Sequence, residues 1–262
     1  MAATGLCGAL PAPILLLQKG WRSVFFVWPM FSIVTIYILA AVVPAFFLMR
    51  YIYRMDTIEK EPPMLLLSLV LYGVLAAVLA GVLEGVAERI LASQINPDSE
   101  KYTIILAFLV VAVIEEGLKF LFLKYRTWRD PNFDYRFDGI VYAVFVSLGF
   151  AAWENLQYVM GYGLSVAVPR ALLALPGHMG FAVFMGAFYG KAKLCEGIGH
   201  TRAKHVNLVT GYIVAVLLHG FYDSCAMIGD TLSTVLFIVF VVAMYFIVIR
   251  LIRKESAQNA PV

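Results

Sequence analysis

Two adjacent glutamates and a lysine lie inside an apolar run, VVAVIEEGLKFLFLK (110–124). Glu115 and Lys119 are four residues apart, so they share one face of a helix, and Glu116 lies beside that face. A lysine next to two carboxylates can pair with one of them and leave the other to act as a general base near neutral pH. This spacing therefore indicates acid–base chemistry in an apolar setting.

Further polar residues interrupt the apolar stretches that follow along the chain. The segment GFAAWENLQY carries Glu154 and Asn155, and LPGHMGFAVF carries His178. In LLHGFYD, His219 and Asp223 are also four residues apart, so they point to one place. A structural ion pair or a packed histidine explains each feature alone, but so many titratable groups on successive stretches indicate a shared site.

Two hydrolytic chemistries fit these residues. In the first, Glu115 or Glu116 activates a water that attacks a carbonyl, and His178, His219 and Asn155 stabilise the oxyanion. In the second, zinc is bound by His178 and His219 with Glu154 or Asp223, because a catalytic zinc needs three protein ligands. No HExxH motif is present. The residues therefore leave both chemistries open: the first requires no cofactor, and the second requires Zn²⁺.

Two classes without hydrolytic activity also accommodate intramembrane acids. A proton- or ion-coupled transporter uses such groups as a relay. Transporters often contain internal repeats, and the sequence shows none. A non-catalytic membrane scaffold is the third class, and the density of acids weighs against it.

The elements that position these residues are expected to be membrane-spanning helices. The chain has 262 residues, 62% hydrophobic and 14% charged, with a mean hydropathy of +0.85. A helix needs roughly 20 apolar residues to cross the hydrocarbon core. Seven stretches qualify, and they predict an all-α polytopic helix bundle: about 25–49, 64–88, 102–124, 138–160, 171–190, 207–228 and 231–252. An eighth span is possible if the N-terminal apolar segment also crosses.

The distribution of lysine and arginine predicts the orientation of the spans. The loops after the first, third and fifth spans, together with the C-terminus, hold fourteen of the twenty cations. The opposite loops hold five, and Lys119 lies within a span. Because cytoplasmic loops are enriched in these residues, we expect the N-terminus outside and the C-terminus in the cytoplasm. On this topology the polar groups lie between the mid-plane and the outer leaflet.

One integral-membrane domain is expected over residues 1–262. It divides into an interfacial lead-in (1–23), a helical core (24–252) and a cytoplasmic tail (253–262). The acids and the arginine that flank the second span are expected at the membrane interface: Asp56, Glu59, Glu61, Glu84, Glu88 and Arg89. Cys7, Cys195 and Cys225 are too scattered for a disulfide framework. The basic patches are short, so we expect a lipid bilayer and no nucleic acid as the partner surface.

These motifs resemble the PrsW family of intramembrane proteases, which is related to the CAAX proteases and the bacteriocin-processing membrane superfamily. The first motif, EExxK, stands at 115–119. FxxxE followed by Asn stands at 150–155, the histidine motif matches His178 with Phe181, and HxxxD matches 219–223. The loop with Asp56, Glu59, Glu61 and Pro62 resembles the family's acidic-proline loop. The similarity spans roughly 50–225.

The resemblance implies an endopeptidase in a bacterial plasma membrane that cleaves single-span membrane proteins, such as anti-sigma factors. It implies that Glu115, Glu116, His178 and His219 are catalytic. Lys119, Glu154, Asn155 and Asp223 would support them, with Glu154 and Asp223 fixing the tautomers of the histidines. Some schemes class the family as metallopeptidases, whereas the CAAX relatives resemble metal-free enzymes.

Overall fold

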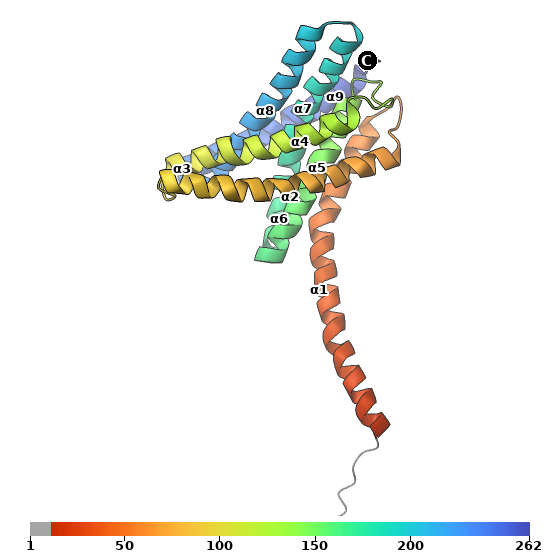
Figure 1. Cartoon of the computed structure of the whole chain (residues 1–262), viewed down its shortest axis with the longest axis vertical. Helices are drawn as coiled ribbons and strands as arrows, with labels where there is room; N and C mark the ends of the chain where they lie inside the picture. The colour runs from red at the N-terminus through yellow and green to blue at the C-terminus, as the bar shows by residue number, and fades with distance from the viewer. Residues whose placement is uncertain (1–11) are drawn as a thin grey trace, which may run out of the picture.

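The computed structural model describes residues 12–262, with side chains described from Ser32 onward. Within this part the chain is almost entirely helical (Figure 1). The helices are α1 (Ala12–Met55), α2 (Pro63–Gln94), α3 (Glu100–Ile105), α4 (Val113–Thr127), α5 (Asp138–Tyr162), α6 (Ala167–Leu172), α7 (Ala174–Gly197), α8 (Thr201–Ile228) and α9 (Thr231–Ala257). A π-helix, η1 (Leu106–Ala112), joins α3 to α4, and a short 3₁₀ turn, η2 (Leu164–Val166), precedes α6.

Helix α5 is the centre of the bundle. Every residue from Asp138 to Ala151 is buried, and α1, α2, α4 and α7 all pack against this helix. Glycines allow the closest approaches, because a Cβ on Gly73 of α2 would overlap the carbonyl of Val146, and one on Gly149 would overlap that of Val70. Small residues at helix contacts are the usual means of close packing in membranes.

The expected membrane bundle is confirmed. Six segments between residues 32 and 262 are long and apolar enough to cross a membrane: Ser32–Met55, Pro63–Gln94, Asp138–Tyr162, Leu164–Gly197, Thr201–Ile228 and Thr231–Ala257. Large apolar side chains on their outer faces, such as Phe47, Leu71 and Val242, are exposed, which suits contact with lipid. The remaining expected span, 102–124, lies within α3, η1 and α4 and packs between α2 and α8.

Two helix boundaries differ from the sequence prediction. Helix α1 begins at Ala12, so residues 12–23 of the expected lead-in belong to a helix that extends well away from the bundle (Figure 1); residues 1–11 lie outside the described part. Span 102–124 is interrupted by the π-helix, one turn before Glu115. Such wider turns occur frequently at functional sites.

One end of the bundle, which we call the tail end, contains the loops 56–62 and 128–137 together with residues 258–262. The C-terminus lies at this end (Figure 1). Val262 N–H donates to the carbonyl of Asp134 in the loop 128–137 at 2.9 Å, and Ser256 Oγ donates to the carbonyl of Met55 at the end of α1 at 2.5 Å. An ion pair of 2.6 Å joins Arg136 to Glu255. The tail therefore packs on the protein.

Candidate active site

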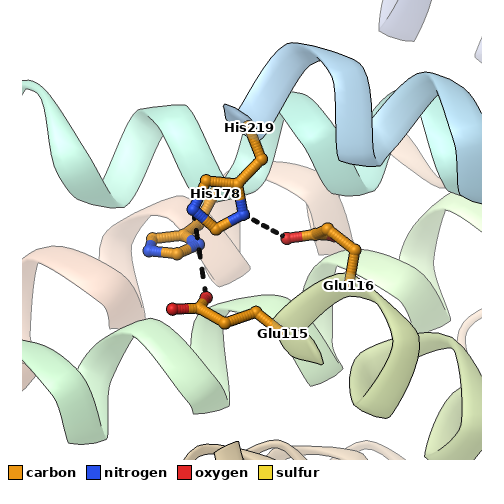
Figure 2. A group of neighbouring side chains, drawn as sticks. All are labelled: Glu115, Glu116, His178 and His219. Carbon is orange, nitrogen blue, oxygen red and sulfur yellow. Dashed lines mark hydrogen bonds and ion pairs between the residues drawn. The ribbon is translucent and has the colours of Figure 1, made fainter. Parts of the chain in front are cut away.

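Four helices bring the predicted polar residues together. Glu115, Glu116 and Lys119 come from the first turns of α4, Glu154 from α5, His178 from α7, and His219 and Asp223 from α8. Figure 2 shows both carboxylates of α4 reaching toward His219, with the ring of His178 next to it. One donor atom from each of Glu115, Glu116, His178 and His219 lies within 4.8 Å of the others.

The ammonium of Lys119 is the hub of this cluster. Its Nζ lies 3.0 Å from Glu115 Oε2, 2.8 Å from Glu116 Oε1 and 3.1 Å from His178 Nδ1. All of these side chains are buried. A lysine ammonium has three donors and no lone pair, so these contacts use its whole hydrogen-bonding capacity.

This arrangement fixes the tautomer of His178. Because Lys119 can only donate, His178 Nδ1 accepts, and the ring proton is on Nε2. Nε2 lies 3.0 Å from Glu154 Oε2, which accepts that proton. Arg170 of α6 pairs with the same oxygen at 3.1 Å. Glu154 therefore contacts the nitrogen of His178 that carries the proton, which is the position that the family resemblance implied for it.

A carboxylate lies beside each ring nitrogen of His219. Nδ1 is 2.9 Å from Glu116 Oε1, and Nε2 is 3.2 Å from Asp223 Oδ2 and 4.0 Å from Glu115 Oε2. Only the doubly protonated imidazolium donates from both nitrogens. The surroundings of His219 therefore favour a cation whose Nε2–H donates to Asp223 and lies near Glu115.

Aromatic rings enclose the cluster. Lys119 Nζ lies 4.0 Å from the centre of the Phe150 ring, a cation–π contact. Phe181 stacks on His219 with ring centres 4.9 Å apart. The motif residues Phe150 and Phe181 thus place apolar surface against the charged groups, which strengthens electrostatic interactions between them.

A cavity of about 650 Å³ opens beside the cluster. Glu115, Glu154, His178, His219 and Asp223 line it, together with apolar residues of α2, α5, α7 and α9. Glu116 and Lys119 are not among the lining residues and lie behind Glu115. The cavity therefore distinguishes the two adjacent glutamates, which the sequence alone could not do.

Three residues differ from the sequence interpretation. Asn155 faces α1, because its amide donates to the Ala41 carbonyl at 2.9 Å and its Oδ1 accepts from Arg170 at 3.0 Å; it does not line the cavity. Arg170, which the sequence analysis counted only as a loop cation, pairs with Glu154. Glu84, expected at the interface, lines the cavity, and its Oε1 is buried without a hydrogen-bond partner among the described residues.

Comparisons with known proteins show the family of the chain. The model of the family described as PrsW family intramembrane metalloprotease matches residues 61–250. The chain belongs to the PrsW family. It is 32% identical to Protease PrsW of Geobacillus kaustophilus over 234 residues, covering 88% of this chain and 96% of the relative. No solved structure matches the chain.

Other relatives show the same coverage. The chain is 32% identical to Protease PrsW of Oceanobacillus iheyensis, over 84% of this chain and 96% of the relative. It is 31% identical to Protease PrsW of Bacillus subtilis, over 88% of this chain and 98% of the relative. This PrsW-family chain is therefore a multi-pass membrane protease of a bacterial membrane-protein family.

The description of the PrsW family includes a metal, so the donor set was compared with the needs of zinc. Two histidines and two carboxylates are suitable donor types, and Glu116 Oε2 is buried without a described partner. The hydrogen bonds do not fit, however. The lone pair of His178 Nδ1 faces Lys119, and His219 lies between carboxylates that call for protons on both nitrogens. Zinc could bind these histidines only if Lys119 withdrew, so no step below uses a metal.

Proposed function

We propose that this membrane protease cleaves single-span membrane proteins, of the anti-sigma-factor type, with Glu115 as the general base. The observation that carries the proposal is that Glu115 is the member of the glutamate pair that lines the cavity. Its Oε2 lies 3.0 Å from Lys119 and 4.0 Å from His219 Nε2. A water bound in the cavity beside this carboxylate has a base on one side and an N–H donor on the other.

The proposed reaction is water attack on a peptide carbonyl. Glu115 removes a proton from the water, and the oxygen forms a bond to the carbonyl carbon. The tetrahedral oxyanion accepts a hydrogen bond from His219 Nε2–H, which it shares with Asp223, while Glu116 at Nδ1 supports the charge of the ring. Glu115 then returns the proton to the nitrogen of the leaving amine as the C–N bond breaks. Protons are conserved, and the chain requires no oxidant or cofactor for this sequence.

The other residues have supporting roles in this proposal. Lys119 holds both glutamates in place and compensates their charge in the apolar interior, where an unpaired ion is costly. Glu154 and Arg170 hold the ring of His178 so that its Nε2 proton points away from Lys119. This places His178 at the cavity wall as a contact for substrate.

The position of the site along α4 supports cleavage away from the cytoplasm. Glu115 lies twelve residues before Thr127, which is about 18 Å along a helix from the tail end. The positive residues gather at the tail end, the side that the charge distribution predicts to be cytoplasmic. The site then lies in the outer half of the membrane.

Reconstitution tests this proposal. The purified protein is placed in liposomes with a panel of single-span bacterial membrane proteins, and cleavage products are identified by mass spectrometry. Glu115→Gln serves as the inactive variant, and Glu100→Gln, at an exposed position in α3, is the matched control. We expect cleavage by the wild type and the control alone. Proton or ion flux through the liposomes without cleavage would instead identify a transporter.

A further inference from the structure

A second group of buried acids lies at the tail end, away from the cavity. Asp56 follows the last residue of α1, Glu61 precedes α2, and Asp138 is the first residue of α5. The sequence interpretation placed Asp56 and Glu61 at the membrane interface together with Glu59, but of these three acids only Glu59 is exposed. Asp56, Glu61 and Asp138 are 1%, 5% and 2% exposed.

The carboxylates converge on one point. One oxygen from each of Asp56, Glu61 and Asp138 lies within 4.8 Å of the other two. Tyr142 Oη donates to Glu61 Oε2 at 2.7 Å, and Tyr135 N–H donates to Asp138 Oδ2 at 2.7 Å. Glu61 and Asp138 are thus held in position by hydrogen bonds, with each other as well as with these donors, and three carboxyl groups share one small volume.

Asp56 has no such partner. Both of its carboxylate oxygens are buried, and neither has a hydrogen-bond partner among residues 32–262. The neighbouring Lys60 does not supply one, because its ammonium donates to the backbone carbonyls of Tyr53 and Asp56. A buried carboxylate without a hydrogen bond loses its full solvation energy, so both oxygens of Asp56 are free to bind a ligand.

We propose that Asp56, Glu61 and Asp138 form a binding site for a hard divalent cation, Mg²⁺ or Ca²⁺. The donors are all oxygens, which these two ions prefer, and the absence of nitrogen and sulfur from this set of three disfavours zinc. The cation neutralises the cluster and connects the α1–α2 loop to the first turn of α5. It is separate from the proteolytic site and does not depend on the proposed function.

The test is metal binding to the full-length protein in detergent after dialysis against chelator. Terbium(III) is the first probe, since it occupies calcium sites and Tyr142, whose hydroxyl contacts Glu61, can sensitise its luminescence. Competition with Mg²⁺ and Ca²⁺ separately identifies the ion that displaces it at lower concentration. The melting temperature is followed in the same titrations, because a ligand that binds only the folded state stabilises it.

Asp56→Asn is the informative variant, with Glu59→Gln as its matched control at an exposed acid. We expect Asp56→Asn to weaken cation binding by about tenfold or more, since ligand charge sets affinity, and to remove the rise in melting temperature. The control and Glu115→Gln should bind as the wild type does. Glu61→Gln provides a second variant if the first fails to fold.

Two results would overturn the proposal. One is no displacement of terbium and no thermal stabilisation by either ion, which would mean that the acids share protons. The other is an equal loss of binding in Asp56→Asn and Glu59→Gln, which would indicate non-specific attraction to a negative surface. Loss of binding in Glu115→Gln would place the cation in the proteolytic cavity instead.

Discussion

Glu115 and Glu116 are adjacent in the sequence but occupy different environments. Glu115 lines the cavity, whereas the Oε1 of Glu116 lies behind it, 2.8 Å from Lys119 and 2.9 Å from His219. The helical rotation between consecutive residues, about 100°, separates them in this way. One glutamate is therefore available to a water and a substrate, and the other orients a histidine.

Replacing Glu115 should remove activity and leave the fold in place. Because Glu115→Gln keeps the shape of the side chain but cannot accept a proton, we expect cleavage to fall by about 10²–10⁴-fold. The melting temperature should change little, since Glu116 still pairs with Lys119. Cleavage of a reconstituted substrate and thermal unfolding are measured in parallel. Full activity in Glu115→Gln would exclude this residue as the base.

Replacing Lys119 should mainly reduce stability. Lys119→Met leaves Glu115 and Glu116 buried without their cation, and breaking a buried ion pair costs about 3–5 kcal/mol. The double variant Lys119→Met/Glu116→Gln should recover part of the free energy of unfolding, because it removes one uncompensated charge. Denaturant unfolding in detergent measures the free energy of unfolding of the single and the double variant. Equal stability of Lys119→Met and the wild type would mean that the glutamates are neutral in the folded protein.

Arg170 should affect activity through Glu154. Arg170→Met removes the ion pair of 3.1 Å and a hydrogen bond to Asn155, so Glu154 loses a partner that keeps it against His178. We expect a decrease in activity of about tenfold, the smaller effect typical of groups that orient a ligand or catalyst. Arg170→Lys should retain more activity than Arg170→Met. The cleavage rates of the two variants are compared on one substrate. Equal rates would mean that the ion pair between Arg170 and Glu154 does not support activity.

The packing of α2 on α5 should depend on its glycines. Gly149→Ala places a methyl group against the carbonyl of Val70, and overpacking of this kind costs about 1–3 kcal/mol. Gly81→Ala on α2 is the control, because no atom lies within 4 Å of the added Cβ. Melting temperatures of the two variants should differ clearly. A stable Gly149→Ala protein would mean that the two helices separate at little cost.

Much of the fold was predictable because the thickness of the bilayer sets the length of an apolar helix that crosses it. The breaks at 59–63, 95–100 and 129–134 carry turn residues, and the helices α2, α3 and α5 begin or end close to them. The i and i+4 spacing of Glu115 with Lys119, and of His219 with Asp223, was sufficient to predict both contacts. The sequence also predicted that four helices contribute to one site.

What the sequence could not show depends on contacts between distant segments. The π-helix at 106–112 lies within an apolar run that the sequence analysis read as one continuous span. Asn155 belongs to a site motif but packs on α1. Its position was not predictable because its partner Ala41 is 114 residues away in the sequence. The burial of Asp56 was not predictable for the same reason, because it depends on the packing of the C-terminal segment and α5 at this end of the bundle.

The central claim is that Glu115 activates water without zinc at the histidines. The most direct measurement is the zinc content of purified, active protein, together with cleavage in the presence and absence of o-phenanthroline, with Mg²⁺ present throughout to keep the second site occupied. The account predicts zinc-free protein that cleaves its substrate with chelator present and becomes inactive in Glu115→Gln. About one zinc per chain, with activity lost to the chelator and restored by zinc, would contradict it and make His178 and His219 metal ligands.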